Sequence, residues 1–142
     1  MGNKRKQIEM SEEEIQAFLD EERVAIVSSF GPRGWPHSMP LWYQVVDGRV
    51  RSWTFAKSQK VKNIERDPRA TVLVEAGYDQ YSELRGVMYE AETVIHSDLD
   101  TVVDQRERLG HDLARRDRPH AHRLRARDGQ GQGRHVVDDD VG

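Results

Sequence analysis

The sequence predicts a small, mainly β domain, an antiparallel barrel with short helices, and three observations support this class. Segments in which apolar and polar residues alternate recur along the chain, and alternation is the pattern of strands that are buried on one face. Asp47-Gly48 is a strong hairpin signal, and a hairpin joins antiparallel strands. Only one short helix is expected between the strands, which favours a barrel over a doubly wound parallel sheet.

The predicted elements begin with a helix after a basic, irregular leader at residues 1–10, which we expect to be flexible. Ser11 is the expected N-cap, and Glu14 occupies the capping-box position three residues later. The helix has an apolar stripe formed by Ile15, Phe18 and Leu19.

Three strands are predicted next, at residues 23–30, 35–46 and 49–55. A turn at Gly31-Pro32-Arg33-Gly34 separates the first two strands. The second strand contains Pro36 and Pro40, which cannot donate to a ladder and therefore confine this strand to an edge, a bulge or a bend.

A short helix is predicted after the third strand, with Ser58 as N-cap and a stop at Asp67-Pro68. Two further strands should cover residues 69–76 and 84–96, the second interrupted at Gly86. Residues 98–113 have the spacing of a last helix.

Residues 114–142 differ from the rest of the chain. They hold seven arginines, five aspartates and scattered apolar residues without a period. Such a segment buries too little apolar area to offset its chain entropy, so we expect disorder or translation outside an ancestral reading frame. The predicted organisation is a leader at 1–10, one domain at 11–113 and this tail. The histidines at 120, 122 and 135 resemble metal spacing only superficially, and no metal is expected.

Composition excludes several classes of protein. The 142-residue chain has no cysteine, so disulfides, thiolate metal sites and a cysteine nucleophile are excluded. No apolar run approaches the length of a membrane span, and we expect a cytoplasmic protein without a membrane partner. Nucleic acid is a poor candidate partner, because the basic stretches are short and the net charge is −3.

The turn between the third strand and the short helix has the composition of a phosphate site. Unpaired N–H groups and the helix dipole favour an anion where the helix begins. Lys57 and Lys60 flank this point, and the hydroxyls of Thr54 and Ser58 can donate to phosphate oxygens. The alternative is that the lysines, with Lys62 and Arg66, form only a solvated helix face.

Four segments resemble the flavin-binding split barrels of the pyridoxamine 5′-phosphate oxidase-like superfamily, and the resemblance extends over about residues 11–113. It is nearest to the branch that uses the deazaflavin coenzyme F-420 instead of FMN. The segments are Pro36-His37-Ser38-Met39-Pro40-Leu41-Trp42-Tyr43, Trp53-Thr54-Phe55, Lys57-Ser58-Gln59-Lys60-Val61-Lys62-Asn63-Ile64 and Asp67-Pro68-Arg69-Ala70.

This resemblance implies an antiparallel split β-barrel of the FMN-binding type and an obligate homodimer with two sites at its interface. The cofactor-binding residues that it implies are Ser38, Met39 and Pro40 along the ring, and Trp53, Thr54, Lys57, Ser58, Gln59 and Lys60 around the phosphate. The C-terminus departs from the family pattern, where a further strand or a basic and apolar segment is usual.

The expected function is hydride transfer between a flavin or deazaflavin and a small conjugated substrate; the alternative is a split barrel that holds a cofactor or haem without turnover. Lys57 and Lys62 favour the longer, acidic tail of the deazaflavin over FMN. No catalytic residue is assigned, and His37 either faces the ring or is structural. The three tryptophans are expected in the core or the dimer seam, and Tyr78 and Tyr81 either close over a substrate or simply pack.

Overall fold

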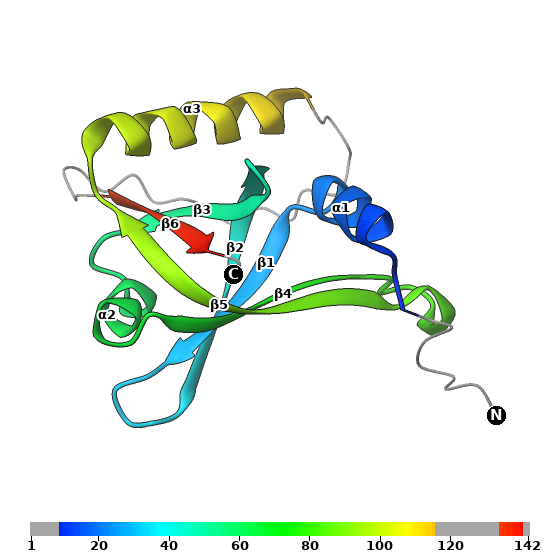
Figure 1. Cartoon of the computed structure of the whole chain (residues 1–142), viewed down its shortest axis with the longest axis horizontal. Helices are drawn as coiled ribbons and strands as arrows, with labels where there is room; N and C mark the ends of the chain where they lie inside the picture. The colour runs from blue at the N-terminus through cyan, green and yellow to red at the C-terminus, as the bar shows by residue number, and fades with distance from the viewer. Residues whose placement is uncertain (1–8, 116–133, 141–142) are drawn as a thin grey trace.

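The computed structural model describes residues 9–115 and 134–140, with side chains for residues 9–105, 107 and 108. Figure 1 shows helices around a curled sheet. In chain order the elements are α1 (Glu12–Glu21), β1 (Val24–Phe30), β2 (Pro36–Val46), β3 (Arg49–Phe55), α2 (Gln59–Arg66), β4 (Arg69–Ala76), the 3-10 turn η2 (Tyr81–Glu83), β5 (Arg85–His96), α3 (Leu99–Arg115) and β6 (Arg134–Asp140).

The sheet is antiparallel throughout, which confirms the predicted fold class. Strands β1 to β5 form one curled sheet in the order β3-β2-β1-β4-β5, and β6 pairs with both of its ends to close a barrel. Helix α2 lies across one end of the barrel, and α3 lies along β3 and β6 (Figure 1). Among the described residues, no helix is long and apolar enough to cross a membrane.

The prediction of a disordered tail from residue 114 is wrong in two places. Residues 114–115 end α3, and residues 134–140 form β6. The prediction counted apolar area alone, whereas a strand inserted between two open edges also pairs backbone N–H and C=O groups on both sides. Residues 116–133 and 141–142 lie outside the described residues, as do the histidines at 120 and 122.

The core fills the barrel interior and follows from alternation along the strands. Ala25 of β1 is level with Leu41 of β2 and Val74 of β4, so these side chains share the inner face. The buried cluster comprises Phe18, Leu19, Ala25, Val27, Tyr43, Val50, Ala70, Val72, Val74 and Val87.

Helix α1 is fixed at both of its ends. At its start the predicted capping box is present: the Ser11 N–H donates to Glu14 Oε2 (2.7 Å), and the Glu14 N–H donates to Ser11 Oγ (3.2 Å). At its end the Tyr43 hydroxyl donates to the Leu19 carbonyl (2.7 Å). Residues 1–8 of the predicted leader lie outside the described residues, and Met10 packs against the core.

The hairpins agree with the sequence except at one glycine. Asp47 (φ 53°) and Gly48 (φ 76°) both have positive φ, as a type I′ turn requires, and join β2 to β3. The predicted interruption at Gly86 is wrong, because β5 runs unbroken and Gly86 pairs with Glu75. The glycine instead allows close packing, since a Cβ there would lie 3.3 Å from the Val74 carbonyl oxygen.

Candidate functional site

The candidate residues lie where β2 and β3 separate. The two strands pair only between residues 43–46 and 49–52. Beyond this point the first half of β2 pairs with β1, whereas the end of β3 pairs with β6. The structure therefore places Ser38, Met39 and Pro40 on one side of the separation and Trp53 and Thr54 on the other.

The edge of β2 that faces this separation offers backbone groups in a defined pattern. The Tyr43 N–H donates to the Arg23 carbonyl (2.9 Å), so the odd-numbered residues of β2 direct their N–H and C=O toward β1. The even-numbered residues direct theirs toward the separation. Pro36 and Pro40 contribute only carbonyls there, while Ser38 contributes both an N–H and a carbonyl. The prediction that the prolines confine this strand to an edge, a bulge or a bend is confirmed, and the structure shows that it is an edge.

The side chains of this half of β2 alternate between the two faces. Ser38 is on the outer face, where its Oγ lies 2.7 Å from Ser28 Oγ. Met39 shares the inner face with Val27 yet is 41% exposed. His37 is also on the inner face, and its buried Nδ1 has no hydrogen-bond partner among the described residues. The structure thus gives His37 no structural hydrogen bond at Nδ1.

Ser58 begins α2 in the way expected of an N-cap, with φ −67° and ψ 153°, but its side chain makes no capping bond. Its Oγ is buried and has no partner within the described part of the chain. The Ser58 N–H donates to the Phe55 carbonyl (3.0 Å), which tightens the turn. A buried hydroxyl without a partner is unusual, and here it lies beside the unpaired N–H groups of a helix N-terminus.

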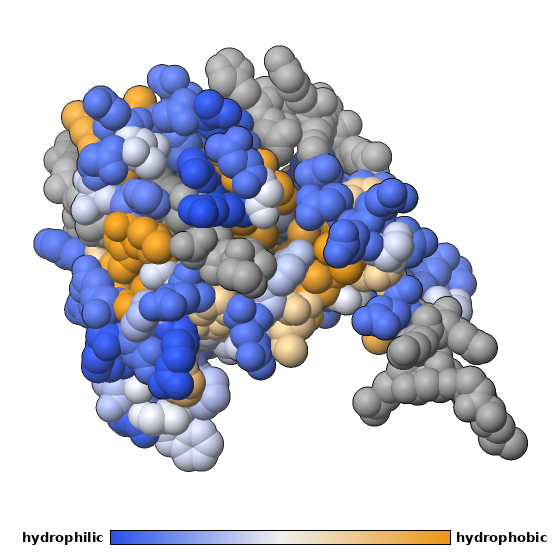
Figure 2. Space-filling model, in the orientation of Figure 1, coloured by the Kyte–Doolittle hydropathy of each residue, from blue (hydrophilic) through white to orange (hydrophobic). Residues whose placement is uncertain are grey.

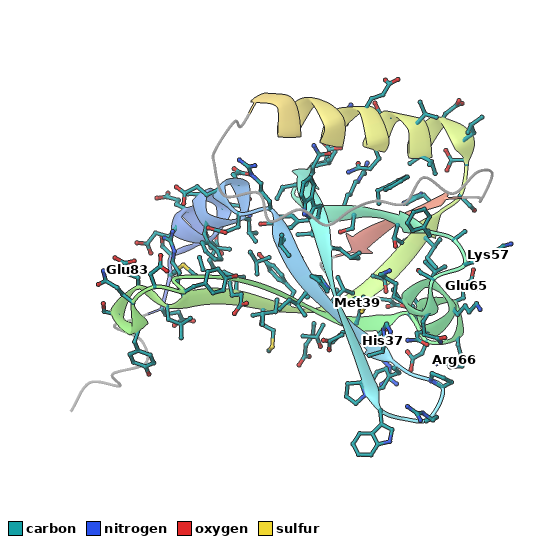
Figure 3. All side chains as sticks on the ribbon, turned by 180° about the vertical axis from the view of Figure 1, so that it is seen from behind. His37, Met39, Lys57, Glu65, Arg66 and Glu83 are labelled. Atoms are coloured by element: carbon teal, nitrogen blue, oxygen red, sulfur yellow. The ribbon has the colours of Figure 1, made fainter. Side chains whose placement is uncertain are left out.

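The two lysines of the turn are not equivalent. Lys57 is exposed and extends away from the barrel (Figure 3). Lys60 is half-buried, and burial lowers its pKa because it disfavours the charged ammonium. Among the described residues no carboxylate pairs with Lys60. An anion bound at the turn would provide the missing counter-charge.

The other predicted residues near this turn, Thr54, Trp53 and Gln59, have different environments. Thr54 is on the inner face of β3 and is only 4% exposed. Trp53 is on the opposite face, and its ring lies 5.8 Å from that of Phe55. The Gln59 side chain donates through Nε2 to Asn63 Oδ1 (2.8 Å), so one of its polar groups is bonded within α2.

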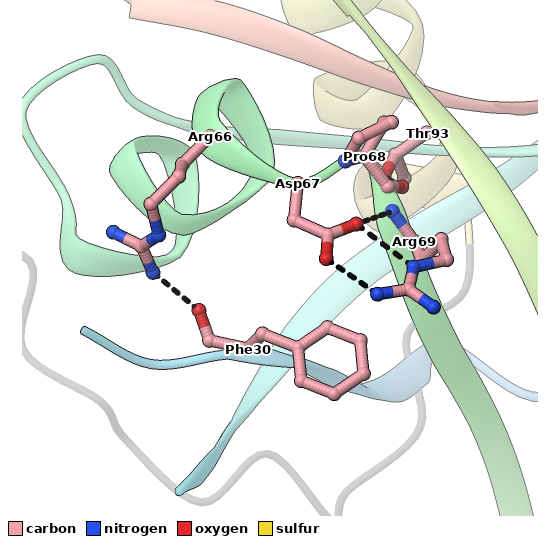
Figure 4. Close-up of polar contacts among 6 residues, drawn as sticks. All are labelled: Phe30, Arg66, Asp67, Pro68, Arg69 and Thr93. Carbon is pink, nitrogen blue, oxygen red and sulfur yellow. Dashed lines mark hydrogen bonds and ion pairs between the residues drawn. The ribbon is translucent and has the colours of Figure 1, made fainter. Parts of the chain in front are cut away.

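Two residues of α2, Asn63 and Arg66, make contacts with β1 that no sequence pattern predicted. Asn63 has no exposed surface and donates through Nδ2 to Ser29 Oγ (3.1 Å). Arg66 is exposed, as the solvated-face alternative requires, but it also donates through Nη2 to the Phe30 carbonyl (2.6 Å; Figure 4). The sequence feature that could have revealed the buried Asn63 is its position between Val61 and Ile64, the two apolar residues that α2 buries.

A groove of 610 Å³ crosses the outer face of β1, β4 and β5 and reaches the start of β2. Its lining includes Phe30, Pro36, Thr71 and Glu90, together with Ser28, the hydroxyl partner of Ser38. The groove therefore adjoins the β2 side of the separation. We regard it as the space next to the candidate site that is open to a small molecule.

Several aromatic residues lie on the surface of this chain. Trp35 is 73% exposed and Trp42 is 42% exposed, so neither is in the core of this chain, and the alternative of a dimer seam stays open for both. Tyr78 and Tyr81 are also exposed, and the Tyr78 hydroxyl contacts Glu75 Oε1 at 3.4 Å. The described residues contain no group of three or more metal-ligating side chains.

The arrangement fits a phosphate-bearing group. The turn combines a buried hydroxyl, helix N–H groups and a half-buried ammonium, which are all donors, and no described carboxylate opposes them. The β2 edge can supply backbone hydrogen bonds to a flat polar ring. The donor set thus suits an anionic cofactor with a ring attached.

Comparison with known proteins gives consistent relatives. The family model described as pyridoxamine 5′-phosphate oxidase matches residues 11–131. A conserved hypothetical protein, Rv2991 from Mycobacterium tuberculosis, is 30% identical with a TM-score of 0.66, over 92% of this chain and 80% of that one. No curated protein sequence matches significantly.

Two more distant structures share the fold. One is described as an F420 reductase, with 16% identity and a TM-score of 0.64 over 87% of this chain and 90% of that one. The other is HutZ, described as the haem storage protein of Vibrio cholerae, with 11% identity and a TM-score of 0.64 over 92% of this chain and 91% of that one. At these identities the likeness concerns the fold alone.

Proposed function

Because the chain belongs to the pyridoxamine 5′-phosphate oxidase family, we propose that it is a cytoplasmic oxidoreductase that binds a phosphate-bearing flavin or deazaflavin. In this proposal it transfers a hydride between the cofactor and a small conjugated substrate. The observation that carries the proposal is the buried Ser58 hydroxyl without a partner, next to the half-buried Lys60 at the start of α2.

In the proposed complex the turn holds the phosphate. Ser58 and the first N–H groups of α2 donate hydrogen bonds, and the Lys60 ammonium supplies the counter-charge in a partly dry position. Thr54 and Gln59 border the same turn, and Lys57 adds positive charge from solvent. These residues position the cofactor and take no part in the redox step.

The edge of β2 orients the ring. The Ser38 N–H is a single donor between the carbonyls of Pro36 and Pro40, so this edge can match a ring edge that presents both acceptors and donors. Met39 and Trp53 lie on the two sides of the separation, where they can contact the ring. When bound, the flavin or deazaflavin supplies the hydride chemistry, while the chain supplies orientation and excludes water.

Within this proposal we favour coenzyme F-420 over FMN. The exposed ammonium groups of Lys57 and Lys62 lie beside the turn and can attract an acidic tail that extends past the phosphate. The fold likeness to an F420 reductase agrees with this choice. We assign no catalytic acid to the chain, because solvent can protonate the product after the hydride transfer.

We also propose a homodimer with the sites at its interface. Apolar residues lie in register across the outer face of four strands: Pro40, Ile26, Leu73 and Met88. Met88 is 62% exposed, and Figure 2 shows apolar patches among the charged groups on the face seen there. A molecular mass of one chain in light scattering at micromolar concentration would contradict the dimer.

The second candidate is a binding protein that holds a cofactor or haem without turnover. The fold likeness to HutZ and the free Nδ1 of His37 favour this alternative. Steady-state reduction of a conjugated acceptor by reduced F-420 or reduced FMN separates the two candidates. An oxidoreductase consumes many equivalents of reduced cofactor, whereas a carrier consumes none beyond the bound fraction.

The ligand that co-purifies from a host that makes both cofactors identifies the natural one. Its absorption spectrum and mass distinguish FMN from F-420, and they would also reveal haem. Recovery of haem alone would contradict the proposed oxidoreductase and support the binding protein.

A further inference from the structure

Asn63 connects the start of α2 to the barrel wall. Its side chain is fully buried, although an amide gains nothing from burial unless its hydrogen bonds are made. Oδ1 accepts from Gln59 Nε2 (2.8 Å) on the first turn of the helix and from Arg66 Nη2 (3.3 Å) on its last. Nδ2 donates to Ser29 Oγ (3.1 Å), which is itself buried at the end of β1.

The same network has a second attachment to β1. Arg66 Nη2 donates to the Phe30 carbonyl (2.6 Å), one residue beyond Ser29 (Figure 4). The helix is therefore held to β1 by a side chain from its middle and a side chain from its end. Val61 and Ile64 add apolar contact with the barrel, but apolar contact is not directional and does not fix the rotation of a short helix.

We propose that Asn63 is a positioning residue for the cofactor phosphate. Through Gln59 and Ser29 it sets the rotation of α2 and hence the direction of the N–H groups, of the Ser58 hydroxyl and of Lys60. This inference rests on the proposed function, because it assumes that the phosphate binds at the start of α2. It assigns Asn63 no contact with the cofactor.

The expected effect is specific for the phosphate. Loss of the Asn63 amide leaves the β2 edge intact, so contacts with the ring persist, while the donors at the turn no longer converge. Asn63→Ala should lower the affinity for FMN about tenfold but the affinity for riboflavin, which lacks the phosphate, less than about twofold. The same contrast is expected between F-420 and its phosphate-free deazariboflavin core.

The test measures dissociation constants by flavin fluorescence for both pairs of ligands. Ser29→Ala removes the acceptor of the Asn63 amide with a smaller change in volume, and should lower the FMN-to-riboflavin preference about threefold. Val74→Ala, in the barrel core level with Ala25 near the start of β1, whereas Ser29 is near its end, controls for general loss of stability and should leave the preference unchanged. If Asn63→Ala does not fold, Ser29→Ala decides.

The outcomes separate this inference from the proposed function. A fall of the preference in Asn63→Ala and Ser29→Ala, but not in Val74→Ala, supports the positioning role. A wild-type preference that both variants retain overturns the role and leaves the phosphate site in place. A wild-type chain that binds each ligand and its phosphate-free counterpart equally overturns both.

Discussion

Replacement of Lys60 by alanine is the most direct test of the phosphate site. The structure places this ammonium half-buried at the start of α2, where burial lowers its pKa and no described carboxylate pairs with it. A charge-assisted hydrogen bond to phosphate contributes about 1.5–3 kcal/mol. Lys60→Ala should therefore weaken FMN binding roughly ten- to a hundredfold, measured by fluorescence titration.

The matched control is Lys62→Ala, which removes an exposed lysine from the same helix. FMN has no acidic tail to reach Lys62, so this variant should bind FMN like the wild type, apart from a small effect that salt screens. Arg66→Ala is unsuitable as a control, because Arg66 holds α2 to the Phe30 carbonyl. Equal losses in Lys60→Ala and Lys62→Ala would show that the basic residues form only a solvated face.

The pH dependence of binding gives a second measurement on the same residue. Burial lowers the Lys60 pKa in the free protein, and a bound phosphate stabilises the charged form and so raises it again. Binding then takes up a proton at alkaline pH. FMN affinity should fall as the pH rises, beginning below the ordinary lysine value of 10.5. An identical fall in Lys60→Ala would assign the effect to another group.

Three further predictions concern stability. Removal of β6 leaves the edges of β3 and β5 open, so thermal unfolding should occur at least about 5 °C lower; an unchanged midpoint would mean that β6 does not close the barrel. Hydrogen bonds from Arg69 lower the pKa of the Asp67 carboxyl from 3.8 to about 2 in the folded chain. The ionised carboxylate therefore stabilises the folded state at a pH above 3.8, and this stabilisation is lost as the pH falls to about 2. The Asp67→Asn variant should accordingly have a lower melting temperature than the wild type at pH 7 and the same melting temperature at pH 2. A difference in melting temperature that does not change with pH would contradict this account. Gly77→Ala would place a Cβ 2.2 Å from the Glu83 carbonyl oxygen at a residue with φ 97°, and should lower the free energy of unfolding in urea by on the order of 3 kcal/mol. The control Gly34→Ala, whose Cβ meets nothing within 4 Å, should lower it by only about 1 kcal/mol. Equal losses in the two variants would refute the steric argument.

Most of the fold could be predicted from local signals. The alternation in β4 and the turn at Asp47-Gly48 depend on neighbouring residues, and both predictions are confirmed. The strand β6 could not be predicted in this way. Its stability depends on two edges that lie far away in the sequence, and its own residues, Arg134–Asp140, are mostly charged. A strand that is defined by its neighbours has a weak signature of its own.

The residues of the candidate site also differ in whether a local sequence pattern predicts them. Ser58 and Lys60 could be chosen because a helix start with a hydroxyl and a lysine is a local pattern. The network of Asn63, Ser29 and Arg66 could not be predicted, because it joins α2 to a strand much earlier in the chain, with Asn63 and Ser29 separated by 34 residues. Whether a polar residue on a helix is buried or solvated depends on what the fold places opposite it.

The two prolines of β2 have a consequence for the behaviour of the free chain at high concentration. An open strand edge can recruit the edge of another molecule and begin a growing aggregate. Where β3 separates from β2, Pro36 and Pro40 lack two of the N–H groups that another strand would need for pairing. Both positions are even-numbered, so the missing N–H groups are on the open edge of β2 and not on the edge that pairs with β1. The edge can thus remain accessible to a small ligand while it is a poor template for another strand.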